Sequence, residues 1–292
     1  MKSLLSAISA QSQEAGQLSP SISAGVKASF WNFARADYQA AYINRQHTYL
    51  DTEDFLLWRS YGLQAVSDGT LYFDPVSVKS DPLHSRDIVQ LVSHTVLWLV
   101  LRVMNYLAKG NTHTLLEQHQ AWEDLTKQLD AWYSTLPETF QPCAQMRHSL
   151  AIRKHRDTPG GSLTEVFFSI EQCAAAIELY HFARILLLVN KPQDQQGISR
   201  LKAYREVSAE AIKHAGAIVS IALGRPGAAV RVEMLLPLFM AGRCLEADDE
   251  RRVVLDVLRA IEKDTGCSTE VTARNLIDDW GCGCIVRLAD KR

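Results

Sequence analysis

Residues 122–142, WEDLTKQLDAWYSTLPETFQP, contain the pattern on which the fold prediction depends. The apolar residues recur in steps of three and four: Trp122, Leu125, Leu129, Trp132 and Leu136. Side chains with this spacing share one face of a helix. Pro137 lacks a backbone N–H and biases the residue before it away from helical angles, so the helix should end there. The stretch therefore predicts a scaffold helix followed by an extended tail that carries Phe140 and Pro142.

The same helical spacing extends over most of the chain. Helices are expected at residues 29–46, 84–109, 114–136, about 163–190, 199–223, 248–264 and 269–280. Strand signals are sparse, because the best candidate, LYFDPVSV at residues 71–78, is interrupted by Pro75. These patterns predict an all-α, multi-helix bundle-like domain of roughly eight to ten helices over residues 26–292. Residues 1–25 are rich in Ser, Ala and Gln and are expected to form a loose N-terminal tail.

The composition is that of an ordinary globular protein. Hydrophobic residues make up 47% of the 292 residues and charged residues 22%, and the formal net charge is −2. This charge gives no electrostatic argument for a nucleic acid or an anionic membrane as partner. The longest apolar run, residues 91–108, contains His94, Arg102 and Asn105. These residues are costly in lipid, so a buried helix is expected there and no membrane partner. The first residues are too weakly apolar to favour a signal peptide.

The cysteines do not predict a metal site. The six lie at positions 143, 173, 244, 267, 282 and 284, and only Cys282 and Cys284 are close together. A zinc site needs several ligands near one another, commonly in Cys-x-x-Cys pairs. Scattered thiols without such pairs indicate a reducing compartment, no disulfide framework and no bound metal. An exposed thiol pair at 282 and 284 that oxidises is the alternative.

No catalytic group or cofactor site can be assigned from the sequence. His113 and His119 are six residues apart and do not share a helix face, and His181 is expected to be a hydrogen-bonded core histidine. The acidic clusters ADDER (247–251) and IDDW (277–280) lack a third carboxylate one turn away, and helix-end electrostatics accounts for the first. Walker, Gly-x-Ser-x-Gly and Gly-x-Gly-x-x-Gly motifs are absent from the sequence. The site prediction is therefore no catalytic residue, no metal, and no cofactor.

One basic cluster stands out. RHSLAIRKHRD, residues 147–157, could contact phosphate or act as a localisation signal. A solvated loop balanced by acids elsewhere is the favoured interpretation.

The pattern W-x-x-L-x(6)-W-x(3)-LP-x-x-F-x-P at residues 122–142 resembles the regulatory, or middle homology, region of fungal zinc-cluster transcription factors. Further segments resemble that region in type and order: FWNFARADYQAAYINRQHTYLD (30–51), ELYHFARILLLVNKP (178–192), LLPLFMAGRCLEADDERRVVLDVLRAIEKDTG (235–266) and Trp280. Together they cover roughly residues 28–281. The resemblance implies a helical domain of a transcription regulator that responds to effectors or partner proteins in the nucleus, with a share in the cytoplasm as an alternative.

The sequence departs from that family in two respects: the N-terminal zinc cluster and the first portion of the family's regulatory region are both expected to be missing from it. Residues 1–25 contain no cysteine and only Lys2 as a basic residue, so the DNA-reading zinc cluster is not carried over. A stand-alone regulator, a truncated gene model and a decaying copy are all compatible with this. We expect no direct DNA binding, and as partners other proteins of transcription regulation, such as a zinc-cluster factor, or a small-molecule effector. Two alternatives are an α-helical enzyme of secondary metabolism, which needs converging polar groups in a pocket, and a ligand-free interaction scaffold with an apolar patch and no pocket.

Overall fold

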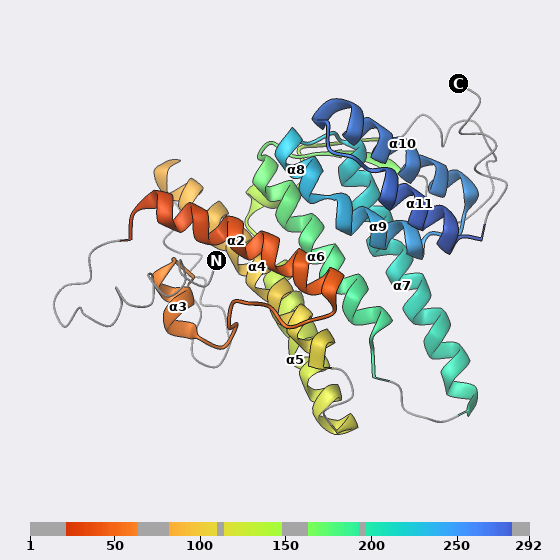
Figure 1. Ribbon diagram of the computed structural model, residues 1–292, viewed down its shortest axis with the longest axis horizontal. Helices are drawn as coiled ribbons and strands as arrows, with labels where there is room; N and C mark the ends of the chain where they lie inside the picture. Colours follow the sequence, from red (N-terminus) through yellow and green to blue (C-terminus); the bar gives the residue numbers. More distant parts are fainter. Residues whose placement is uncertain (1–21, 64–81, 110–113, 148–162, 193–196, 282–292) are drawn as a thin grey trace.

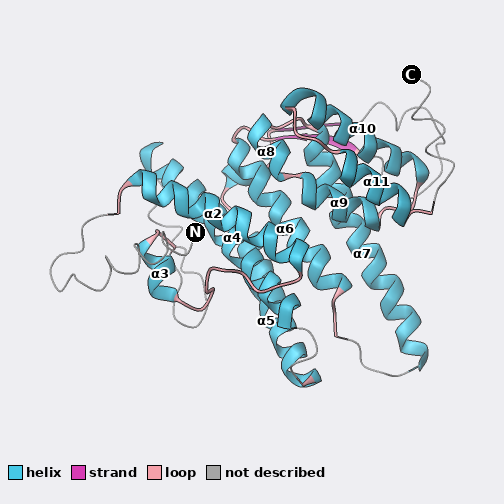
Figure 2. Cartoon of the chain, in the orientation of Figure 1, coloured by secondary structure: helices cyan, strands magenta, loops and turns pink. Residues whose placement is uncertain are grey.

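Helices form nearly all of the described structure, a computed structural model that describes residues 22–63, 82–109, 114–147, 163–192 and 197–281 (Figures 1 and 2). Within these ranges the all-α prediction is confirmed. The α-helices are α2 (Ala24–Asn44), α3 (Phe55–Ser60), α4 (Pro82–Lys109), α5 (Leu115–Ser134), α6 (Glu171–Val189), α7 (Gly197–Leu223), α8 (Ala228–Glu233), α9 (Leu235–Cys244), α10 (Asp248–Thr265) and α11 (Glu270–Asp279).

Helices α4 and α6 form the centre of the fold. Helix α6 packs against α4 on one side and α7 on the other, while α2 and α5 cover α4. Helix α9 packs against α6 and α7, and α10 and α11 lie over α9 (Figure 1). The C-terminal helices therefore form a second group that meets the N-terminal group along α6.

The two central helices are both long and apolar. Arg86–Lys109 and Glu171–Val189 are long and apolar enough to cross a membrane. However, 67% of the most apolar 18-residue stretch of each helix is buried inside the fold. The six residues from Val96 to Leu101 are each at most 1% exposed. This burial is typical of core helices, as expected for residues 91–108.

Tryptophan side chains connect distant elements throughout the fold. Each of the six indole N–H groups donates to a backbone carbonyl, so these large side chains can be buried without losing a polar partner. The donor–acceptor pairs are Trp31 to Tyr61, Trp58 to Asp51, Trp98 to Thr52, Trp122 to Leu187, Trp132 to Val92, and Trp280 to Gly242. The tryptophans therefore hold the helices in place relative to one another and to the loops.

Helix α5 contains most of the stretch quoted first, and its inner face agrees with the prediction. Leu125, Leu129 and Trp132 are buried, whereas Trp122 is only partly buried. The helix begins with a capping box in which Thr114 and Glu117 satisfy each other's backbone N–H groups. It ends at Ser134. The expected extended tail is instead a 3₁₀ turn, Glu138–Phe140, that buries Phe140 beside Trp132.

One predicted helix begins too early. Residues 164–167 were assigned to a helix starting near 163, but they form strand β2 (Thr164–Phe167), which pairs antiparallel with β1 (Ala144–Arg147). β-branched and aromatic residues favour a strand when a partner strand is present, and helix α6 starts only at Glu171. The short helices α3 and α8 were also not predicted, because six residues are too few for a clear period. Residues 71–78 lie outside the described ranges.

Candidate functional site

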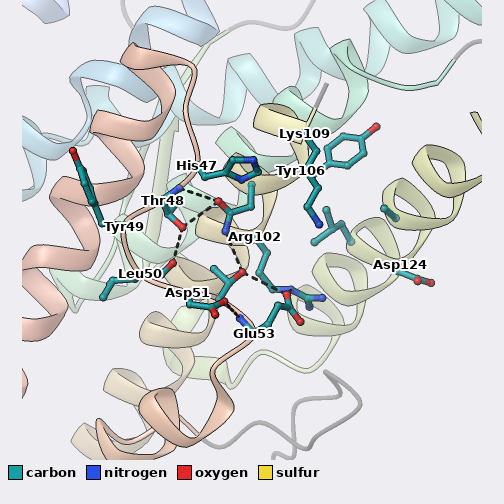
Figure 3. A pocket seen from close by; sticks show the side chains of 14 residues that line it. His47, Thr48, Tyr49, Leu50, Asp51, Glu53, Arg102, Tyr106, Lys109 and Asp124 are labelled. Carbon is teal, nitrogen blue, oxygen red and sulfur yellow. Dashed lines mark hydrogen bonds and ion pairs between the residues drawn. The ribbon is translucent and has the colours of Figure 1, made fainter. Parts of the chain in front are cut away.

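A cavity of about 480 Å³ opens between the α2–α3 loop, the C-terminal half of α4, and α5. We call it the polar pocket (Figure 3). The loop contributes residues 47–53, whereas the two helices contribute side chains at helical spacing. From α4 these are Arg102, Asn105, Tyr106 and Lys109, and from α5 they are Ala121, Asp124 and Leu125. Each helix thus presents one face to the pocket.

A buried carboxylate holds the loop in place. Asp37 is 2% exposed, and its two oxygens accept the N–H groups of Tyr49 and Leu50, each at 2.9 Å. Burial raises the pKa of Asp37, and the two backbone N–H donors oppose this shift by stabilising the carboxylate. The loop begins where α2 ends, at Arg45, whose φ of 52° turns the chain out of the helix.

Asn105 fixes the same loop from the side of α4. Its Oδ1 accepts the Thr48 N–H at 2.9 Å and lies 3.1 Å from the Thr48 hydroxyl, and its Nδ2 donates to the Thr52 hydroxyl at 3.1 Å. The Trp98 indole donates to the Thr52 carbonyl at 3.1 Å. The loop is therefore hydrogen-bonded to two core helices, α2 and α4. These partners give the pocket a preformed wall.

Arg102 is the charged group at the base of the polar pocket. Its guanidinium lies over the Trp98 ring, 4.8 Å from the ring centroid, and its side chain is 19% exposed. It donates to the Gln128 amide oxygen, and its Nε lies 3.6 Å from a carboxylate oxygen of Glu53. Burial lowers the pKa of Arg102, while the negative charges of Glu53 and Asp124 oppose the shift. The side chain is a cation held largely out of water.

A larger cavity of about 1170 Å³ lies on the other side of α4. We call it the apolar groove; it is lined by the ends of α2, α4 and α6 and by α8, α9 and α11. Four aliphatic side chains on its edge are exposed to an unusual degree: Ile43 72%, Val189 51%, Val232 39% and Val271 65%. Deeper in the groove lie Leu107, Leu235, Leu236, Phe239 and Met240.

Polar groups at the edge of the groove include both charges. Arg243 pairs with Asp279 at 2.8 Å, and Arg45 and Asp278 also line the cavity. The Tyr42 hydroxyl donates to the sulfur of Met240 at 2.7 Å, and burial raises the Tyr42 pKa. The groove therefore has an apolar floor and a polar rim with no formal excess of either charge.

Elsewhere the structure pairs His181 with His214. Their Nδ1 atoms are 2.8 Å apart, so one ring donates and the other accepts. Burial lowers the pKa to about 3 for His181 and about 4 for His214, so both are neutral near pH 7. This agrees with the expectation of a hydrogen-bonded core histidine. Among the described residues, no three His, Cys, Asp or Glu side chains are placed to hold a metal ion.

The other sequence candidates are distributed over the fold. Residues 247–251 begin α10, with three acidic residues in the first turn, as helix-end electrostatics predicts. Asp279 of the IDDW segment pairs with Arg243 in the groove. Cys143, Cys173, Cys244 and Cys267 are free. Cys282, Cys284, His113 and nearly all of the basic cluster 147–157 lie outside the described residues.

Sequence reasoning did not find either cavity. The residues of the polar pocket come from a loop and two helices that are far apart along the chain, and none belongs to a known chemical motif. One signal was present: polar residues at 102, 105, 106 and 109 recur at helical spacing on an otherwise apolar helix. This face marks the pocket wall.

The described residues form an all-helical domain with two cavities on its surface. The model of the fungal-specific transcription factor domain family matches residues 4–279, and the chain belongs to this family. It is also similar to the transcription activator AMTR1 of Alternaria alternata, with 32% identity over 274 residues. That match covers 87% of this chain and 36% of the relative, so the chain spans about a third of that protein. The comparison with solved structures found no match.

Proposed function

We propose that this chain is the regulatory domain of a nuclear transcription regulator and that it acts by docking an amphipathic helix of a partner protein in the apolar groove. A partner of this kind is a protein of transcription regulation, such as a zinc-cluster factor. Family membership supports a role in transcription. The similarity to the activator AMTR1 supports activation rather than repression. Residues 26–292 form the regulatory domain in this proposal.

The main support for this proposal is the set of exposed aliphatic side chains around the groove. Ile43, Val189, Val232 and Val271 come from four different elements and converge on one cavity. Exposed apolar side chains beside an apolar groove are typical of surfaces that receive a partner helix. The charged rim, with Arg45 and Asp278 among its members, would set the orientation of that helix.

Binding fits the polar pocket better than catalysis does. The pocket gathers charged side chains from several elements, which the enzyme alternative requires. However, the hydroxyls of Thr48 and Thr52 are occupied by Leu50 and Asn105, and the lining includes no serine or cysteine. A nucleophile beside a base is therefore missing from this lining. The ligand-free scaffold is disfavoured because two cavities are present.

The groove is tested with full-length chain fused to a heterologous DNA-binding domain that drives a reporter gene. We expect the fusion to change reporter output relative to the DNA-binding domain alone. The double variant Ile43→Glu/Val271→Glu should abolish this change, because two carboxylates would enter an apolar interface. Leu56→Glu is the matched control, since Leu56 is 80% exposed on α3, outside the groove. Equal output from groove and control variants at equal abundance would reject groove docking.

DNA recognition is assigned to the partner in this proposal. The net charge of −2 provides little attraction to phosphate, so non-specific DNA binding should be weak. A mobility-shift assay with the purified chain at physiological salt tests this. No shift by the chain alone is expected. A tight, sequence-dependent shift would instead place DNA binding in the chain itself, for example through the basic cluster 147–157.

A further inference from the structure

We propose that the polar pocket is a binding site for a small organic dicarboxylate, which replaces Glu53 as the partner of Arg102. This site is separate from the apolar groove, and the inference does not depend on partner docking there. It gives the domain a second input, a small acidic molecule sensed between α4, α5 and the α2–α3 loop.

The first argument is the incomplete pairing of Arg102. A well-formed ion pair of guanidinium and carboxylate has N–O distances of about 2.7–2.9 Å, commonly two in parallel. The Arg102–Glu53 contact is 3.6 Å, and the Glu53 side chain is 65% exposed. The other partner of the guanidinium, Gln128, is a neutral amide. This largely buried cation is thus compensated only at longer range, by Glu53 and Asp124, and a ligand carboxylate could bind it more closely.

The second argument is a second cation on the same wall. Lys109 lies seven residues after Arg102, which places both side chains on one face of α4 with about 10 Å between their backbone positions. Figure 3 shows the Lys109 amine directed back toward the middle of the pocket, and the Arg102 guanidinium near Glu53 at its base. Two converging cations favour a ligand with an acidic group at each end.

The remaining lining fits the body of such a molecule. Leu125 and Ala121 supply apolar surface opposite α4 for a short carbon chain. The Asp124 carboxylate also lines the cavity, and its negative charge acts on Arg102, so a ligand carboxylate must compete with Asp124 as well as with Glu53. The cavity of about 480 Å³ lies at the small end of the usual range for ligand sites, about 300–1,000 Å³. The cavity size selects a small molecule, and Arg102 and Lys109 provide the contacts for its two carboxylates, in competition with the lining carboxylates of Asp51, Glu53 and Asp124.

Glu53 couples ligand binding in the polar pocket to the α2–α3 loop. It belongs to the loop that Asp37 and Asn105 hold, and it directly precedes the start of α3 at Asp54 and Phe55. A ligand carboxylate at Arg102 would release the Glu53 side chain to solvent. The contact between loop and α4 would then pass through the ligand, which would stabilise the loop when the pocket is filled.

The test is calorimetric titration of the purified full-length chain with succinate and with adipate. Succinamide serves as the uncharged control and sodium chloride as the ionic-strength control. We expect one of the two dicarboxylates to bind, and neither control to do so. Arg102→Gln should weaken binding at least about tenfold, since it removes a charge-assisted contact. Glu53→Gln should tighten binding, because it removes the internal competitor. Arg259→Gln, in an exposed ion pair on α10, should leave binding unchanged.

Opposite effects of two substitutions in one ion pair distinguish ligand binding from simple stabilisation. If the pair were only structural, Arg102→Gln and Glu53→Gln would both lower the melting temperature and neither would affect titration. Circular dichroism checks that each variant folds. If Arg102→Gln does not fold, Lys109→Gln replaces it and should weaken binding. The proposal is overturned if neither dicarboxylate binds, if succinamide binds equally, or if Glu53→Gln weakens binding.

Discussion

The polar pocket and the apolar groove share a wall but have opposite character. Both are bounded by the last two turns of α4 and by the chain leaving α2. The pocket is lined mainly by polar side chains, with Asn105 bonded to the loop threonines and Arg102 3.6 Å from Glu53, whereas the groove leaves aliphatic side chains exposed. The pocket therefore has a polar wall that is held by internal hydrogen bonds, whereas the groove has an apolar surface that is open to solvent.

The difference between the two cavities arises because one short stretch of α4 has a polar face and an apolar face. In residues 102–109, RVMNYLAK, the polar positions 102, 105, 106 and 109 face the pocket. Met104, Leu107 and Ala108 face the groove. Such a helix end separates two sites by about its own diameter, roughly 10 Å. The two cavities therefore lie on opposite sides of one helix.

The largest effect is expected from removing the tryptophan beneath the polar pocket. Trp98 is 0% exposed, supports Arg102 and donates to the loop at Thr52, so Trp98→Ala should lower the free energy of unfolding by about 3–5 kcal/mol. Trp280 is its counterpart at the groove, where it ties α11 to Gly242 of α9. It is only partly buried, so Trp280→Ala should cost less, about 2 kcal/mol. Denaturant melts measure both, and equal losses would contradict the difference in burial.

The sequence predicted the helices better than the sites for a physical reason. Helix α10 was predicted at residues 248–264 and spans Asp248–Thr265, because its period and its acidic first turn are local features. Strand β2 was missed, because its partner lies about twenty residues away and pairing decided its state. The pocket depends on contacts such as Asp37 with Leu50 and Asn105 with Thr52, which no local period encodes. The helical period likewise placed Trp122 on the inner face of its helix but could not give its extent of burial, which is only partial.

A second prediction concerns Glu178 on α6, which lines neither cavity. It is 2% exposed, its Oε1 has no hydrogen-bond partner, and burial raises its pKa well above 4.5. A carboxyl group with a raised pKa stabilises the fold below its unfolded pKa, and this contribution is lost as pH rises. Glu178→Gln should therefore match the wild-type stability near pH 4 and exceed it at pH 7, by on the order of 1–3 kcal/mol.

Thermal or denaturant melts of both proteins from pH 4 to pH 8 test this. Dicarboxylate titration and the reporter assay should be unchanged in Glu178→Gln, because α6 is stabilised without altering either lining. A stability difference that is independent of pH would show that folding does not shift the pKa of Glu178. If Glu178→Gln changed only dicarboxylate affinity or only reporter output, the packing around Glu178 would affect one cavity and not the other.

The smallest effect is expected from the contact that joins the two cavities. Tyr106 lines the polar pocket, and its hydroxyl donates to the Asn190 carbonyl at 3.2 Å, while Asn190 lines the groove. Tyr106→Phe removes this bond and keeps the ring, so the free energy of unfolding should fall by only about 0.5–1 kcal/mol. If the wall acts as one rigid body, dicarboxylate affinity and reporter output should both stay at wild-type levels. If Tyr106 carries a signal between the sites, dicarboxylate should change reporter output in the wild-type fusion and not in Tyr106→Phe. We expect the first result, because the buried face of α4 fixes both linings more strongly than one partly exposed hydrogen bond can.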